Sequence, residues 1–222
     1  MLRRRSGTPA TGPGNPVHPW VVPCQHDAMD ARTLSNGTLW LSPPTVHDID
    51  TITACCREPS IGEWTTMPVP YERADAEKFV FDIVTPGWAD RAPTWALRPA
   101  EHGPVLGMIG LGPLYLPRRD RDTAEIGFWL SPEARGRGLM TQAVDLVCRA
   151  AFDLTGFAFE RLEWRAIIGN HASAAVARSS GFHYEGRLRG GGVQRGVRRD
   201  LWVASRLHTD PAGPADGWPP GV

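Results

Sequence analysis

One segment constrains the fold more than any other part of the chain: residues 124–152, with the sequence AEIGFWLSPEARGRGLMTQAVDLVCRAAF. The apolar run at residues 124–130 has the composition of a strand. Two closely spaced glycines follow, and from about Leu139 to Leu154 apolar residues recur at helical spacing. The segment therefore predicts a strand, a glycine-containing loop and a helix that packs on the resulting sheet.

The loop between this strand and this helix has the features of an anion-binding site. Gly136 and Gly138 allow the backbone to come close to a ligand, and the helix behind them offers unpaired N–H groups and the positive end of its dipole. Such a helix start binds phosphate or pyrophosphate, and Arg135 and Arg137 add positive charge. The chain has no Gly-Lys-Ser/Thr triplet, and Thr141 stands where a dinucleotide fingerprint has its third glycine. On the glycines alone, a structural turn and a ligand loop both remain open.

The rest of the chain alternates between strand and helix patterns, which predicts a mixed α/β (α+β) fold around a central sheet. Helices are expected at residues 45–57, 73–84 and 139–154, and from Asn170 to Gly181. Strands are expected at residues 38–41, 94–97, 105–111, 124–130, 161–168, 182–188 and 200–207.

Both ends of the chain are rich in Gly and Pro, which disfavours helix and sheet. We expect residues 1–35 to form a disordered extension, residues 36–208 the folded domain and residues 209–222 a disordered tail. Translation from Met29 is an alternative account of the first segment. Lys plus Arg and Asp plus Glu both number 24, so we expect no nucleic-acid partner. No apolar run is long enough to span a membrane, and no Cys or His spacing suggests a metal site.

Two motifs in the predicted loop and helices resemble those of a known family. The run from Arg135 to Met140 resembles the (Q/R)xxGx(G/A) loop of the GNAT acetyltransferase superfamily, with Met140 where Gly or Ala is commoner. Asn170–Ser173, followed by Gly181–Phe182, is similar to the N-x-A-S…G-F signature of the ribosomal-protein N-terminal-acetyltransferase (Rim-type) branch. The resemblance covers residues 36–208. It implies a mixed sheet whose parallel fourth and fifth strands splay apart, flanked by helices.

The resemblance also implies a binding mode for acetyl-CoA without a metal. The pantetheine arm would lie in the splayed gap and pair with the backbone of the fourth strand at Phe128, Trp129 and Leu130. An N–H near Leu130 would polarise the thioester carbonyl, and Asn170 matches the Asn that contacts the cofactor near its reacting end. The pyrophosphate would bind the loop and helix start, at Arg135, Gly136, Arg137, Gly138, Leu139, Met140 and Thr141.

An amine must lose a proton to attack, so a base is needed. Glu163 is our first candidate because Glu163–Trp164–Arg165 resembles the E-x-R of the family's fifth strand, and Glu125 is the second. For either carboxylate, an ion pair with Arg161 or Arg165 is the structural alternative.

Protonation of the leaving thiolate needs an acid, and many family members use a tyrosine seven residues after the Asn. That position is Ala177 here. Ser173 matches the serine proposed as the acid in the ribosomal-protein branch. The alternative is that Ser173 bonds only to the backbone in the first turn of its helix.

We therefore expect a cytoplasmic acetyl-CoA-dependent N-acetyltransferase that acts on a primary amine, with a protein N-terminal α-amine as the branch's suggestion. A small amine such as an antibiotic or a polyamine, a longer acyl group such as succinyl, and a non-catalytic acyl-CoA-binding module stay open, as does a homodimer. Arginines around the glycine turn before the last strand suit a solvated turn; they are Arg187, Arg189, Arg195, Arg198 and Arg199.

Overall fold

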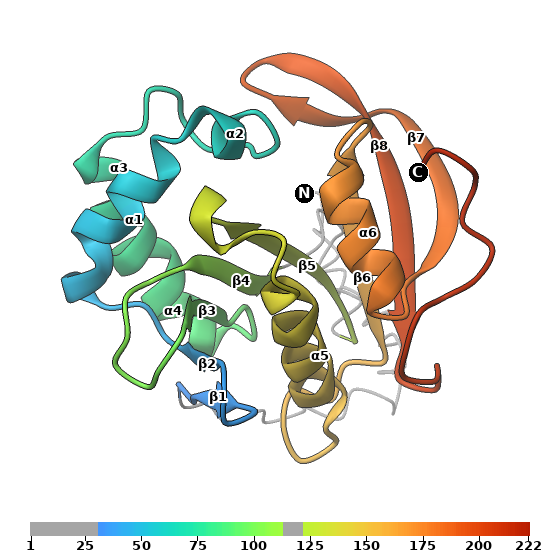
Figure 1. Ribbon diagram of the computed structural model, residues 1–222, viewed down its shortest axis with the longest axis horizontal. Helices are drawn as coiled ribbons and strands as arrows, with labels where there is room; N and C mark the ends of the chain where they lie inside the picture. The colour runs from blue at the N-terminus through green and yellow to red at the C-terminus, as the bar shows by residue number, and fades with distance from the viewer. Residues whose placement is uncertain (1–30, 113–121) are drawn as a thin grey trace, which may run out of the picture.

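A computed structural model describes residues 31–112 and 122–222 of the chain. Within these ranges eight strands form one sheet in the order β1-β2-β3-β4-β5-β6-β8-β7 (Figure 1). All neighbouring pairs are antiparallel except β5 and β6, which run parallel. The strands are β1 (Leu34–Ser35), β2 (Trp40–Ser42), β3 (Thr94–Arg98), β4 (Gly107–Gly112), β5 (Thr123–Leu130), β6 (Arg161–Ile167), β7 (His183–Gln194) and β8 (Val197–Leu207).

Helices cover both faces of this sheet, as the sequence pattern predicts. The first group lies between β2 and β3: η1 (Val46–Asp48), α1 (Ile49–Cys56), α2 (Pro59–Gly62), α3 (Arg73–Lys78), the π-helical η2 (Phe79–Val84) and α4 (Thr85–Ala89). The second group follows β5 and β6: η3 (Pro132–Ala134), α5 (Leu139–Phe152) and α6 (His171–Ser179). None of the helices in the described ranges is both long and apolar enough to cross a lipid bilayer.

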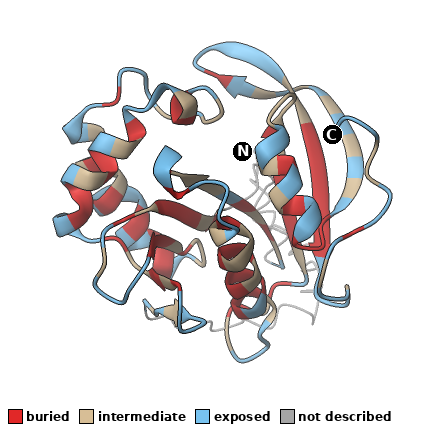
Figure 2. Ribbon diagram, viewed as in Figure 1, coloured by how far each residue is buried: buried red, intermediate tan, exposed pale blue. Residues whose placement is uncertain are grey.

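The sheet has a hydrophobic core on each face, because successive strand residues point in opposite directions. Trp95 and Leu97 of β3 belong to the core that contains the buried stripe of α5, whereas Ala96 between them packs with residues of α1 and α3. Figure 2 shows the buried residues concentrated on the sheet and on the inner faces of the helices. Leu154, which we expected to end the buried stripe of α5, is 84% exposed because the helix ends at Phe152.

The parallel pair β5–β6 splays, which confirms the expected GNAT-like arrangement. Their pairing runs from Thr123 with Arg161 to Ile126 with Trp164 and stops there. β5 continues to pair with β4 as far as Leu130, on its other side. The second half of β5 is therefore paired on one edge only, next to a widening gap.

The last hairpin is longer than the sequence predicts. We expected its strands to end at Leu188 and to begin at Asp200, but pairing extends to Gln194 with Val197. The intervening residues are rich in Gly and Arg and therefore look like a loop. A two-residue turn closes the hairpin at Arg195 and Gly196, with φ of 46° and 81°, and a bulge between Leu188 and Gly192 absorbs the extra residues.

Both domain ends extend beyond the limits that we expected. Residues 1–30, including Met29, lie outside the described residues. The segment that starts at residue 31 packs on the domain, since the carbonyl of Arg32 accepts a hydrogen bond from the Trp95 indole at 2.9 Å and β1 pairs with β2. The guanidinium of Arg32 also stacks 4.7 Å from the centre of the Phe157 ring.

The expected disorder of residues 209–222 is wrong for this structure. The indole N–H of Trp218 donates to the carbonyl of Phe182 at 2.8 Å, and its ring packs 5.7 Å from Trp164 and 5.5 Å from Tyr184. Ala215 is buried, and its N–H donates to the carbonyl of Arg178 at 2.9 Å. The contacts of Trp218 and Ala215 hold the tail against the domain. Their stabilisation outweighs the tendency of the Gly and Pro residues to leave the tail unstructured.

The docked tail predicts a loss of stability when Trp218 is truncated. Because the ring is half-buried, Trp218→Ala should lower the free energy of unfolding by about 2 kcal/mol, which corresponds to a melting temperature about 4–8 °C lower. Thermal unfolding measures this directly, and Asp216→Ala on the same tail is the exposed control. Equal melting temperatures for Trp218→Ala and the wild type would show that the tail does not stabilise the domain.

Candidate active site

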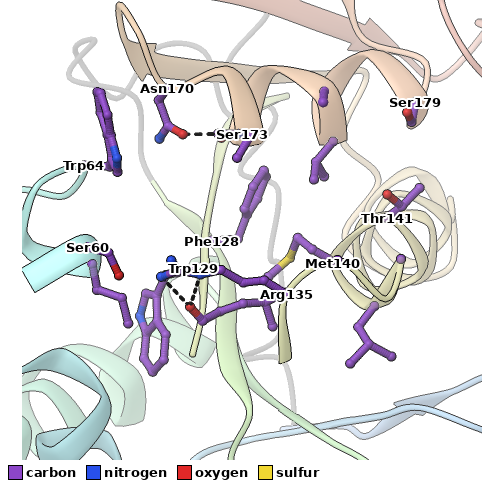
Figure 3. A pocket seen from close by; sticks show the side chains of 18 of the residues that line it. Ser60, Trp64, Phe128, Trp129, Arg135, Met140, Thr141, Asn170, Ser173 and Ser179 are labelled. Atoms are coloured by element: carbon purple, nitrogen blue, oxygen red, sulfur yellow. Dashed lines mark hydrogen bonds between the residues drawn. The ribbon is translucent and has the colours of Figure 1, made fainter. Parts of the chain in front are cut away.

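A cleft of about 480 Å³ opens where β5 leaves β6. Its floor is the second half of β5, and α5, α6 and the α2 region form its walls (Figure 3). Most of the cofactor residues predicted from the sequence line it: Phe128, Trp129, Leu130, Arg135, Gly136, Gly138, Leu139, Met140, Thr141 and Asn170. Arg137 is exposed and is not among the lining residues.

The backbone of β5 presents polar groups to this cleft. The N–H of Ser131 donates to the carbonyl of Leu106, next to β4, at 2.9 Å. Since hydrogen-bonding directions alternate along a strand, the N–H groups of Phe128 and Leu130 point away from β4, into the gap. The Leu130 carbonyl accepts two hydrogen bonds from Arg135, from Nε at 3.1 Å and from Nη2 at 3.0 Å. The Leu130 N–H stays available to a ligand carbonyl lying along the strand.

The glycine loop leaves the start of α5 open. Gly138 is the N-cap residue with φ of 70°, and no side chain caps the helix. Gly136 has φ of 71°, and a Cβ added at either glycine would meet no atom within 4 Å. Both glycines are required by the left-handed backbone rather than by crowding. The uncapped N–H groups and the positive helix end can therefore receive a phosphate.

A second cavity of about 460 Å³ lies on the other side of the point where the strands diverge. Glu125 and Gly127 of β5, Arg165 of β6 and the residues 191–194 of β7 line it. Five residues line both cavities: Trp64, Thr65, Phe128, Asn170 and Ser173. The two cavities thus meet at the splay, and a group held in one can reach a group held in the other.

The two candidate carboxylates occupy different environments. Glu163 is 8% exposed and lies between Arg161, at 3.2 Å, and Arg165, so the ion-paired alternative describes it. It lines neither cavity. Glu125 is the neighbour of Glu163 in the parallel register and faces the second cavity. Burial raises the pKa of Glu125 and the charge of Glu163 adds to this, whereas Arg165 opposes it.

Asn170 and Ser173 form a local network at the start of α6. The Asn170 side chain accepts a hydrogen bond from the Ser173 N–H at 3.2 Å, as an N-cap does. The Ser173 hydroxyl accepts a hydrogen bond from the Trp164 indole N–H at 3.0 Å. The alternative in which Ser173 bonds only to the backbone is therefore wrong. Its hydroxyl keeps its own proton to donate to a second partner. Ala177, at the tyrosine position, is buried in the core.

Sequence reasoning missed the contribution of the segment after α2. Trp64 and Thr65 line both cavities, and Ser60 of α2 lines the first. Trp64 stands beside Asn170 in Figure 3, and its ring lies 3.3 Å from where a Cβ of Gly169 would be. No periodicity marks this segment, because it is neither helix nor strand. The described residues contain no cluster of three His, Cys, Asp or Glu side chains that could hold a metal ion.

Known proteins share both the sequence and the fold. The chain is 38% identical over 110 residues to "Putative ribosomal N-acetyltransferase YdaF" of Bacillus subtilis (strain 168), which is 47% of this chain and 55% of that protein. The chain thus spans about half the length of the curated relatives that it matches.

Two solved structures share the fold, at an identity that establishes the fold alone. The apo structure of RimL, the ribosomal L7/L12 alpha-N-protein acetyltransferase, superposes with a TM-score of 0.69 at 17% identity, over 80% of this chain and 94% of that chain. The microcin C7 self immunity acetyltransferase MccE, in complex with acetyl-CoA and AMP, superposes with a TM-score of 0.67 at 19% identity, over 78% of this chain and 93% of that chain.

The family model of the acetyltransferase (GNAT) domain matches residues 38–183, which include the glycine loop, both splayed strands and α6. This match extends over well more than half of the chain and contains every residue that lines the first cavity, whereas the second cavity is also lined by residues beyond the match, from Gly191 to Leu201. The chain belongs to the GNAT acetyltransferase family.

Proposed function

We propose that the protein is an acetyl-CoA-dependent N-acetyltransferase that acts on a primary amine, directly within a ternary complex. The observation that carries this is the meeting of the two cavities at the splay of β5 and β6. One cavity contains the open helix start of α5, and the other contains Glu125. An acyl donor and an amine would approach each other from opposite sides of the sheet.

The cleft fits acetyl-CoA by its shape and by its polar groups. The one-sided edge of β5 at Phe128–Leu130 can pair with the amide groups of a pantetheine arm, and the α5 start from Gly138 to Thr141 can receive a pyrophosphate. The acetyl-CoA complex of MccE supports this choice of donor. When bound, acetyl-CoA supplies an activated acetyl group as a thioester.

Three groups of the chain would handle the charges of the transfer. Glu125, directly or through water, takes a proton from the amine as its nitrogen bonds to the acetyl carbon. The Leu130 N–H donates to the carbonyl oxygen as negative charge develops there. The carbon–sulfur bond then breaks, the sulfur leaves with the bonding electron pair as a thiolate, and the Ser173 hydroxyl donates a hydrogen bond to it. A thiolate leaves readily near neutral pH, so the contribution of Ser173 is the smallest of the three.

The acceptor is proposed to be a protein N-terminal α-amine. The names of the YdaF relative and of the RimL neighbour both point to ribosomal proteins. A CoA-release screen with acetyl-CoA against N-terminal peptides and small amines tests the proposal. We expect turnover with at least one peptide. Turnover with a small amine and no peptide would identify a small-molecule acceptor, and turnover with succinyl-CoA in place of acetyl-CoA would identify a different acyl donor. Tight acetyl-CoA binding without turnover on any amine would instead support a binding module.

Acetyl-CoA binding should depend on the open space at Gly138. Gly138→Leu places a side chain in the cleft at the start of α5 and should weaken binding of CoA by about tenfold or more. Gly37→Leu is the matched control, because Gly37 also has a positive φ, at 88°, and open space but lies in the β1–β2 turn. Calorimetry measures both affinities. Equal affinities for the two variants would contradict the pyrophosphate site.

The rate of transfer should depend on the ionisation of Glu125. Only the deprotonated carboxylate accepts a proton, so kcat/KM should fall as the pH drops through its pKa, which burial has raised. Glu125→Gln should lower the rate about a hundredfold and leave a pH dependence that follows the amine alone, as measured from CoA release at a series of pH values.

Glu163→Gln is the companion variant for this prediction. It removes a negative charge that raises the pKa of Glu125, so the acidic limb should move to lower pH while much of the rate remains. CoA affinity and thermal unfolding verify that both variants are folded. A full rate across the pH range for Glu125→Gln would show that Glu125 is not the base.

A further inference from the structure

We propose that Arg195, at the tip of the β7–β8 hairpin, is a positioning residue that holds the segment after α2 over the acceptor cavity. This segment, residues 62–67, starts at the last residue of α2 and is named the cover loop. The inference rests on the proposed function, because it takes the second cavity to be the acceptor site. In Figure 1 the hairpin tip reaches across the top of the molecule toward α2.

Five hydrogen bonds join the hairpin tip to backbone carbonyls of the cover loop. Arg195 donates from Nη2 to Gly62 at 2.9 Å, and from Nη1 to Met67 at 3.0 Å and Thr65 at 3.2 Å. Gln194 donates from Nε2 to Glu63 at 2.8 Å and to Thr65 at 2.9 Å.

The cover loop needs these donors because its residues 63–67 form neither a strand nor a helix. Gln194 is 4% exposed, so its amide is committed to the loop rather than to water. Its Oε1 also accepts a hydrogen bond from Arg199 Nε at 3.3 Å, which fixes the orientation of the amide. The hairpin tip therefore acts as a clamp for the cover loop.

The backbone conformation at Arg195 indicates that this residue is present for its side-chain bonds and not for the turn. Its φ of 46° is a left-handed conformation that costs energy for an arginine. The turn of Arg195 and Gly196 has positive φ at both residues, a geometry for which Asn-Gly is the preferred sequence. Turn geometry alone would favour Asn at this position. The arginine thus occupies a position that suits its bonds to the loop better than it suits the turn.

The clamp affects the acceptor site because it positions Trp64 and Thr65. Trp64 lies between the clamped carbonyls of Glu63 and Thr65, and Trp64 and Thr65 both line the two cavities at their junction. The glycine loop and the start of α5 lie on the opposite wall of the cleft and make none of these five bonds. Releasing the clamp should therefore loosen the acceptor site more than the pyrophosphate site.

Arg195→Asn tests this inference without endangering the fold, because Asn suits the turn. Hydrogen–deuterium exchange of the peptide that covers residues 60–68 should become faster by about tenfold, because three hydrogen bonds are lost. The KM for the acceptor peptide should rise by a similar factor, with kcat changed less than about twofold and the Kd of acetyl-CoA nearly unchanged. Arg195→Lys should restore part of the acceptor affinity, since its ammonium can still donate to a loop carbonyl.

Arg189→Asn is the matched control. It removes the same charge from the same hairpin, at an exposed position whose charge helps to lower the pKa of Asp200. Exchange of the cover loop and acceptor KM should match the wild type.

Two results would overturn the inference, and they are distinguishable. Unchanged exchange in an active Arg195→Asn variant would show that Arg195 does not hold the loop, and faster exchange with an unchanged KM would show that the loop does not serve the acceptor. An inactive wild type would overturn the proposed function, and the acceptor role of Arg195 with it, whatever the exchange rates.

Discussion

The structure depends on one interrupted pairing. β5 and β6 run parallel for four residue pairs, from Thr123 with Arg161 to Ile126 with Trp164, and then separate. Backbone N–H groups beyond Ile126 on that edge have no strand partner within the sheet, although an unpaired buried N–H is costly. The gap is stabilised by what surrounds it: α5 and α6 cover it from one side, and the cover loop and the hairpin reach it from the other. The cleft is thus a consequence of sheet geometry rather than a hollow in the surface.

Charges on the sheet give the two carboxylates different environments. Arg161 pairs with both Glu163 and Glu185, and Arg165 pairs with Glu163 as well. These contacts neutralise Glu163 and keep it buried, since a buried charge requires partners. Glu125 lies next to this cluster, but it is not a member of the ion pairs that Glu163 forms with Arg161 and Arg165. Its desolvation, together with the nearby Glu163 charge, raises the pKa of Glu125 against the opposing effect of Arg165.

The site is supported by segments that are distant along the chain. Trp218 of the tail packs on Trp164, and the indole of Trp164 orients the Ser173 hydroxyl. The hairpin tip holds the cover loop, which lies about 130 residues earlier in the sequence. Two surface segments that a sequence pattern would assign to solvent therefore contribute to the interior of the site. This explains why the domain ends and the last hairpin differ from their expected limits.

The sequence by itself determined the local parts of this protein: the strand before Ser131, the left-handed turn at Gly136 and Gly138, the helix after it and the Asn170 cap. These depend on residue periodicity and on backbone preferences between near neighbours, which a single segment contains. Only the tertiary structure decided that Glu125 faces a cavity while Glu163 is ion-paired. The same holds for Trp64, which lines both cavities, and for Arg195, which donates a hydrogen bond to the carbonyl of the next residue, Thr65. Such contacts arise from strand register and from packing between remote segments, and no local pattern encodes them.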